Sequence, residues 1–101
     1  MLTLPIKKKW FDMILSGEKK EEYREDSPYY ETRFRNLWGY PAYWSKPHNV
    51  RLRNGYRKGS QSIIVTCRLG YGQGKTEWGA EAGKNYYKLF ILSVAREERT
   101  E

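Results

Sequence analysis

The sequence has little of what disulfides and metal sites need, since it contains one cysteine and one histidine among 101 residues. A lone cysteine cannot form a disulfide within the chain, and one cysteine with one histidine cannot build the usual zinc site. Cys67 stands in the apolar run Ser62–Leu69, where we expect a buried, unreactive thiol. His48 follows Pro47 in a polar stretch, and we expect a solvated side chain without a role. No metal and no cofactor are therefore expected.

Long hydrophobic runs are also missing. No stretch of the sequence is apolar and long enough to span a bilayer. Residues Met1–Lys9 lack the apolar core of a signal peptide. The one amphipathic helix that the pattern predicts is too short to be a good interfacial anchor. We therefore expect a cytoplasmic protein without a membrane partner, and nothing in the sequence identifies a protein partner.

A phosphate-binding loop is absent too, although one segment imitates it. Residues Gly70–Thr76 end in Gly-Lys-Thr. Such a loop has an earlier glycine where Leu69 stands here, and it opens a helix where Glu77–Gly79 stands here. We interpret the segment as a flexible turn between strands.

What the chain does have is positive charge and aromatic side chains. It carries 19 lysines and arginines against 12 aspartates and glutamates, which gives a formal net charge of +7, and its aromatic residues include nine Tyr and four Trp. A basic surface attracts polyanions through the release of counterions, so the composition favours RNA or a nucleotide as partner. The alternative is a surface charge that only keeps the protein in solution. The cations expected to form a diffuse footprint are Lys8, Lys9, Arg33, Arg35, Arg51, Arg53, Arg57 and Lys58.

Hydrophobic spacing and turn residues predict two strands and two helices in the first part of the chain. Leu2–Ile6 alternates apolar and polar residues, which is typical of a strand. Lys8–Ser16 has apolar residues at helical spacing and is ended by Gly17. Lys19–Glu25, bounded by turn residues, is predicted to be the next strand. The second predicted helix is Ser27–Gly39, which begins with a capping serine and a proline and ends at a glycine.

The rest of the chain is predicted to be rich in strands. The strands expected there are Val50–Arg53, Ser62–Leu69 and Tyr86–Ala95. Asn54-Gly55 is a strong hairpin signal after the first of them. The expected loops and tail are Tyr40–Asn49, Gly70–Gly83 and Arg96–Glu101. This order is typical of a compact, barrel-like α+β fold, mainly β, with two packed helices. We expect one domain over residues 1–95, followed by a charged tail over residues 96–101.

The segment Lys19–Arg24 brings charged residues of both signs together. Side chains alternate along a strand, so Glu22 and Arg24 are expected to face the same way while Tyr23 faces the core. Lys19, at the turn between helix and strand, can reach over the same face. Such a cluster can position a phosphate, hold the edge of a base through Glu22, or shift proton affinities enough for acid–base chemistry. The alternative is a surface strand with weak ion pairs.

The same segment carries a family resemblance. The pattern Gly-x-Lys-x-x-Glu-x-Arg is formed by Gly17, Lys19, Glu22 and Arg24. After a predicted strand and a Trp-containing helix, it resembles the signature of the ASCH domain, which is related to the PUA fold of RNA-modification proteins. Residues Arg53–Tyr56 and Glu77–Gly79 resemble features of short bacterial and phage-type members. The resemblance implies a PUA-like small β-barrel of roughly five to six strands with two flanking helices, and it implies RNA binding.

The resemblance also implies which residues form the site. Lys19, Glu22 and Arg24 would line a basic cleft, with Lys7 as a neighbour at the end of the first strand. Lys19 and Arg24 would hold the phosphate or sugar of RNA or of a modified nucleoside, and Glu22 would accept hydrogen bonds from a base amine. Lys19 and Glu22 are also the catalytic candidates. Further binding candidates are Arg53 and the stacking aromatics Tyr56, Trp44 and Trp78, for which core packing is the alternative.

Some ASCH proteins are enzymes, which leaves two activities open. One branch resembles an amidohydrolase that acts on acylated cytidine through a Lys, a Thr and a Glu. Lys19 matches that lysine, but Glu22 stands at the threonine position, and the separate glutamate would have to be Glu77 or Glu81. Another branch looks like a metal-assisted ribonuclease, whose metal needs oxygen ligands. The carboxylates near the motif are Glu21, Glu22 and Glu25.

A protein-interaction module is the third class of function that the sequence leaves open. The aromatic loop Tyr40–Trp44 is the feature that favours it. The motif itself does not separate a binding cleft from a catalytic one, because the same Lys-Glu-Arg group serves both.

Overall fold

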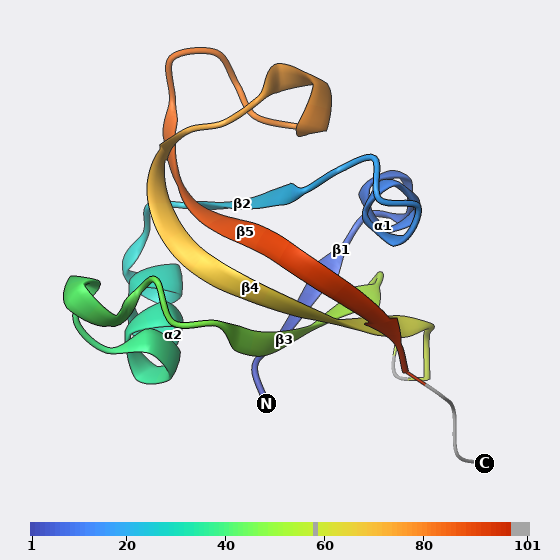
Figure 1. Ribbon diagram of the computed structural model, residues 1–101. Helices are drawn as coiled ribbons and strands as arrows, with labels where there is room; N and C mark the ends of the chain where they lie inside the picture. Colours follow the sequence, from blue (N-terminus) through green and yellow to red (C-terminus); the bar gives the residue numbers. More distant parts are fainter. Residues whose placement is uncertain (58, 98–101) are drawn as a thin grey trace.

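One curled sheet carries the fold. The computed structural model describes residues 1–57 and 59–97, and in this part of the chain five strands pair in the order β1-β3-β4-β5-β2 (Figure 1). The helices and strands are β1 (Thr3–Ile6), α1 (Lys8–Leu15), β2 (Glu21–Glu25), α2 (Pro28–Trp38), β3 (His48–Asn54), β4 (Ser62–Gln73) and β5 (Asn85–Arg96). Two short 3₁₀ helices, η1 and η2, cover Pro41–Tyr43 and Thr76–Trp78. The predicted fold class, a mainly β α+β fold with two helices, is confirmed.

The sheet is a half-barrel whose two edge strands face each other. β1 pairs with β3 in parallel, and the other neighbouring strands are antiparallel. β1 and β2 are the edges of the sheet. The guanidinium of Arg24 on β2 donates a hydrogen bond from Nη2 to the carbonyl oxygen of Pro5 on β1, at 2.8 Å. We call this line of contact between β1 and β2 the seam.

Both helices form where capping residues and apolar spacing predict them. In α1, Phe11 and Ile14 are fully buried, and Gly17 follows the helix with φ 86°. At the start of α2, the Ser27 hydroxyl accepts a hydrogen bond from the backbone N–H of Tyr30 at 3.4 Å. Figure 1 shows α1 and α2 at opposite ends of the sheet. The helices therefore leave the seam between them.

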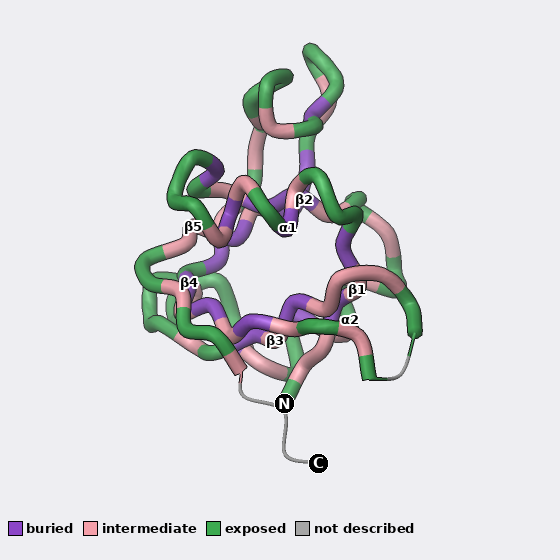
Figure 2. Tube along the Cα trace, turned by 90° about the vertical axis from the view of Figure 1, so that its right-hand side faces the viewer, coloured by how far each residue is buried: buried purple, intermediate pink, exposed green. Residues whose placement is uncertain are grey.

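The main core is one cluster of apolar side chains from β1, β3, β4, β5 and both helices. Figure 2 shows buried positions recurring along the strands. The core members with no exposed surface are Phe11, Ile14, Val50, Leu52, Ile63, Val65, Cys67 and Leu89. Burial raises the pKa of the Cys67 thiol to about 12. The predicted buried thiol is confirmed.

The loop predicted for Gly70–Gly83 is wrong for its first residues. β4 continues to Gln73 and pairs with β5, from Gly70 opposite Lys88 to Gln73 opposite Asn85. Packing explains the glycine at position 70, because a Cβ atom there would overlap the ring of Phe90 and lie 3.0 Å from its Cζ. Glycine at this position makes room for an aromatic ring rather than a turn.

The connection before β3 also differs from the prediction. β3 begins at His48, so the predicted loop Tyr40–Asn49 ends two residues earlier, at Pro47, and contains η1. His48 is not a solvated loop residue: it pairs with Cys67, and its ring lies edge-on to Trp38 with centroids 5.3 Å apart. Extended pairing with β4 accounts for this.

The hairpin predicted after β3 forms, but with a longer connection than a two-residue turn. Gly55 has φ 85°, and its N–H donates to the carbonyl oxygen of Ile6 on β1 at 2.9 Å. The chain then continues through residues 55–61 before β4 begins. The glycine therefore ties the end of β3 to β1.

The end of the described chain is partly strand. Arg96 is the last residue of β5 and pairs with Ile63, so the predicted charged tail begins inside the sheet. Residues 98–101 of that tail, and Lys58 of the predicted cationic footprint, lie outside the described residues. Within the described residues, neither helix has the length and apolarity needed to cross a bilayer.

Candidate functional site

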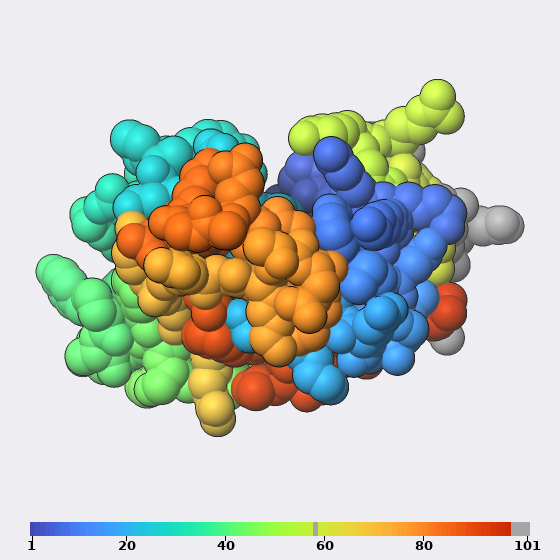
Figure 3. All heavy atoms as spheres, turned by 90° about the horizontal axis from the view of Figure 1, so that it is seen from above, coloured from blue at the N-terminus to red at the C-terminus, as the bar shows by residue number. Residues whose placement is uncertain are grey.

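A pocket of about 330 Å³ opens at the seam. Both edge strands contribute to it, together with α1, the start of α2, the β3–β4 connection and η2. Figure 3 shows the surface hollowed between the N-terminal residues in blue, the residues of α2 in cyan and the loop between β4 and β5 in orange. The side chains that shape it are Lys7, Trp10, Lys19, Glu22, Tyr23, Arg24, Tyr30, Tyr56 and Trp78.

The floor of the pocket is a network of a lysine, a glutamate and an arginine, which we call the floor cluster. Lys19 Nζ lies 3.0 Å from one carboxylate oxygen of Glu22, and Arg24 Nη1 lies 2.8 Å from the other. The three side chains are 1%, 4% and 13% exposed. This is a buried network and not the pair of weak surface contacts that was the alternative. Because desolvation offsets much of the attraction in a buried ion pair, such a network is weak evidence for stability and more typical of a functional site.

Backbone carbonyls complete the floor cluster. The Lys19 ammonium also donates to the carbonyl oxygen of Trp78, and Arg24 donates to that of Pro5. Lys19 Nζ lies 4.7 Å from the centre of the Trp10 ring. Burial lowers the pKa of Lys19, while the neighbouring Glu22 carboxylate raises it. The lysine is therefore held between an apolar environment and its counter-charge.

The register of β2 explains why the floor cluster faces inward. Glu22 pairs with Leu89 and Arg24 with Tyr87, and both partners are buried in the main core. The chain turns toward the pocket before β2, where the Lys19 N–H donates to the Met13 carbonyl oxygen at 2.9 Å. The prediction that Glu22 and Arg24 share a face is confirmed.

Tyr23 is buried, as predicted, but in a second, smaller core cluster on the opposite face of β2 from the main core. Because Glu22 takes the inner face, Tyr23 packs on the other side in a small cluster with Ala80 and Tyr86. Its hydroxyl accepts a hydrogen bond from the Lys75 N–H at 2.9 Å and donates to Glu21 at 3.2 Å. Burial raises the pKa of Tyr23 to about 12. The loop between β4 and β5 folds over this tyrosine.

Aromatic side chains form the walls. Trp78, on η2, is half-buried, and the next residue, Gly79, approaches Trp10 so closely that a Cβ atom would lie 3.0 Å from the indole ring. Tyr30 lies beside Arg24, with 5.9 Å between the guanidinium carbon and the ring centre. Tyr56 is 88% exposed and lines the mouth. The pocket is thus polar and positive below and aromatic around its sides.

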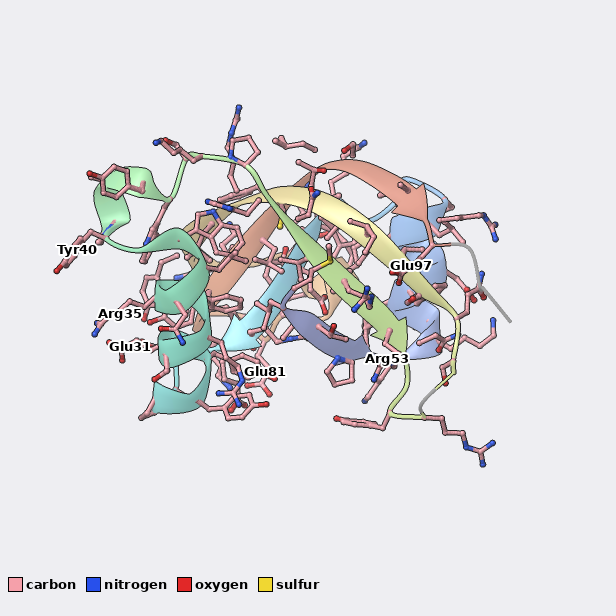
Figure 4. All side chains as sticks on the ribbon, turned by 90° about the horizontal axis from the view of Figure 1, so that it is seen from below. Glu31, Arg35, Tyr40, Arg53, Glu81 and Glu97 are labelled. Atoms are coloured by element: carbon pink, nitrogen blue, oxygen red, sulfur yellow. The ribbon has the colours of Figure 1, made fainter. Side chains whose placement is uncertain are left out.

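Several predicted residues meet at this pocket and others do not. Lys7, Tyr56 and Trp78 line it together with the floor cluster. Arg53 pairs with Pro5 but is not a lining residue. Figure 4 shows it on the opposite side of the view from Glu31, Arg35 and Tyr40.

Trp44 lies elsewhere. It packs against the main core beside Tyr87 and lines a second, smaller cavity of about 130 Å³ near α2 and η1. The aromatic loop Tyr40–Trp44 therefore belongs to a different part of the surface from the floor cluster. The two glutamates considered for amidohydrolysis, Glu77 and Glu81, are exposed and do not line the larger pocket.

The carboxylates near the motif are each paired with a cation. Glu21 lies 3.1 Å from Lys88 Nζ, and Glu25 lies 3.4 Å from Lys84 Nζ. Within residues 1–57 and 59–97, no three His, Cys, Asp or Glu side chains gather as metal ligands would.

Sequence reasoning missed Trp10 and Tyr30 as pocket residues. Both stand at apolar positions of the predicted helices, and both pack partly against the main core. Which end of such a stripe reaches the seam depends on how the helix lies against the sheet, so the spacing alone holds no signal for it.

Comparisons of the chain with protein-family models, with curated proteins and with solved structures found no match. The resemblance to the ASCH domain therefore stays a prediction that depends on the sequence motif.

Proposed function

We propose that this chain is an ASCH-type, PUA-like domain that binds RNA or a modified nucleoside in the pocket at the seam. The observation that carries the proposal is the buried floor cluster of Lys19, Glu22 and Arg24 beneath aromatic walls. These are the same three residues that the family resemblance implies for a cleft. Single-stranded RNA recognition has two components. Cations contact acceptor groups of the RNA, and aromatic rings stack on its bases.

The size of the pocket supports a single nucleotide as ligand. A volume of about 330 Å³ is at the lower end of the range for small-molecule sites. A site of this size suits one small molecule, such as a nucleoside, rather than a duplex. A base would have to be unstacked to enter, which favours single-stranded RNA or a free nucleoside.

Its charge supports a polyanion as partner. Three cations and one carboxylate line the pocket, and the cations are Lys7, Lys19 and Arg24. The chain as a whole carries a formal net charge of +7. Binding that uses this charge weakens as salt is added, because releasing counterions into a more concentrated salt solution gains less free energy.

The test is a titration of short single-stranded RNA at low and moderate salt with the wild type, Tyr56→Ala and Tyr40→Ala. Both tyrosines are mostly exposed, at 88% and 75%, so neither substitution removes core packing. Loss of one stacked base at the pocket mouth should weaken binding roughly 5- to 150-fold in Tyr56→Ala. Tyr40→Ala, away from the pocket, should bind like the wild type.

Two results would contradict this proposal. Equal binding by all three proteins would mean that the charge is generic and that the pocket is not the RNA site. No binding by the wild type at low salt would remove RNA as the ligand.

A second candidate function, nucleoside processing, is favoured by one observation. Burial lowers the pKa of Lys19, and an amine with a lowered pKa is a better base or nucleophile near neutral pH. The test is mass spectrometry of acylated and unmodified nucleosides incubated with the wild type and with Glu22→Gln. Turnover by the wild type that is lost in the variant would support the enzyme. If no nucleoside gives a product, binding without catalysis is the function that remains proposed.

A further inference from the structure

We infer that the floor of the pocket selects a nucleobase that presents a carbonyl edge, as uracil and hypoxanthine do, over one that presents an amino group. This inference rests on the proposed function, because it names which base the same pocket takes. It reverses the role expected for Glu22 from the sequence, that of accepting a hydrogen bond from a base amine.

The first step is that the acceptors of the floor are already engaged. One oxygen of the Glu22 carboxylate faces Lys19 and the other faces Arg24, and the side chain is 4% exposed. The carbonyl oxygens of Trp78 and Pro5 each accept one further hydrogen bond, from Lys19 and Arg24 respectively. Each oxygen of Glu22 thus already accepts from a cation, and the carboxylate holds the two cations in place.

The second step is that donors of the floor are left over. An ammonium group has three N–H donors, and Lys19 uses two of them, toward Glu22 and Trp78. Arg24, with five N–H donors, bonds Glu22, Pro5 and the Tyr23 carbonyl oxygen. Its Nε is buried and has no hydrogen-bond partner among the described residues. A ligand atom that meets this floor therefore meets N–H groups.

The third step is the sign of the charge. Two cations and one carboxylate leave the floor cluster with a net positive charge, and burial keeps water from screening it. A carbonyl oxygen carries partial negative charge and is attracted, whereas an amino group turns its positive end toward the same cations. The aromatic walls, with Trp10 and Trp78, suit a flat ring and orient its edge toward the floor.

The experiment measures the affinity of the wild type for two matched pairs of free nucleosides. Uridine and cytidine differ in the 4-position carbonyl or amino group and in the proton that N3 carries in uridine. Inosine and adenosine differ in the same way at position 6 and N1. Single-stranded RNA hexamers that differ by one U or C repeat the comparison in a longer chain. Uridine and inosine should each bind about tenfold more tightly than their amino counterparts, the factor expected when a charge-assisted hydrogen bond is gained.

Variants locate the preference on the floor. Lys19→Met keeps the apolar stem but removes the ammonium, so it should reduce the preference to about twofold or less. The matched control is Lys8→Met, because the Lys8 side chain is 76% exposed and pairs with Asp12 on the surface. It should keep the preference of the wild type. If Lys19→Met fails to fold, the preference of the wild type across the two pairs still decides the matter.

The outcomes separate this inference from the proposed function. Binding of both members of each pair with equal affinity, or tighter binding of cytidine and adenosine, would overturn the inference and leave nucleotide binding in place. Competition by inorganic phosphate with no dependence on the base would overturn it as well, because the floor would then be a phosphate site. The absence of any binding by nucleosides and hexamers would overturn both.

Discussion

Gly70 lies within β4, where the ring of Phe90 occupies the space that a side chain would need. A Gly70→Ala substitution adds one methyl group against this ring. We expect it to lower the free energy of unfolding by about 1–3 kcal/mol, as overpacking does. Thermal or chemical denaturation of the variant measures the change.

A second substitution shows whether this contact is the cause. Phe90→Leu shortens the opposing side chain, so the alanine should cost clearly less in the double variant than in the wild-type background. An equal cost in both backgrounds would mean that the two residues do not interact in this way.

Single residues also show what the sequence could and could not reveal about the site. The spacing of Glu22 and Arg24 fixes a common face on any strand, so the floor cluster could be predicted from the motif. The motif could not show that this face is the inner one. A tyrosine stands between the two charged residues, and hydrophobicity assigns the tyrosine to the core. The structure resolves this by covering Tyr23 with the loop between β4 and β5.

At the scale of elements, one ion pair links β3, the start of β4 and the end of β5. Arg51 on β3 donates two hydrogen bonds to the carboxylate of Glu97, just after β5, each at 2.7 Å, and Ser62 on β4 donates a third at 2.5 Å. The hydrogen bonds from Arg51, followed by that from Ser62, lower the pKa of Glu97 from its usual 4.5 to about 2. A carboxylate with a lowered pKa stabilises the folded state above its ordinary pKa and loses that effect as the pH falls.

The expected result is a pH-dependent difference between the wild type and Glu97→Gln. The wild type should have the higher Tm above about pH 5, and the difference should shrink as the pH falls from 4.5 toward 2. Glu18→Gln, at an exposed position, is the matched control and should not change with pH in the same way. A difference in Tm between the wild type and Glu97→Gln that stays constant down to pH 2 would contradict this account.

The elements differ in how far local sequence determines them. The two helices could be predicted because the signals are local: both segments have an apolar stripe and a terminal glycine, and α2 also begins with a serine cap. The end of β4 could not be predicted in this way. Gly70–Gln73 is glycine-rich, and its pairing depends on β5, which follows a loop. The pocket walls Trp10 and Tyr30 were missed for a related reason, since their positions depend on how each helix packs.

At the scale of the whole molecule, the curl of the sheet creates the candidate site. The strands β1 and β2 are distant in the sheet order but meet across the seam, where Arg24 bonds Pro5. The pocket opens there, and η2 reaches it from the loop between β4 and β5 to place Trp78 beside the floor cluster. The arrangement pairs a buried positive floor with aromatic walls, which is the basis of the proposed RNA or nucleoside binding.

The four tryptophans allow this claim to be tested within one molecule. Trp10 and Trp78 line the pocket. Trp38 and Trp44 do not, and their indole N–H groups donate to the carbonyl oxygens of Lys46 and Gly39. Each indole N–H gives its own signal in a two-dimensional NMR spectrum of ¹⁵N-labelled protein, so the four positions report separately on a bound ligand.

The measurement is a titration of the labelled wild type with a short single-stranded RNA, repeated with uridine. We expect the indole signals of Trp10 and Trp78 to shift in a saturable way while those of Trp38 and Trp44 stay close to their starting positions. Shifts confined to Trp38 and Trp44, or no shift at any of the four under conditions where both ligands are in excess, would contradict the assignment of the pocket as the RNA or nucleoside site.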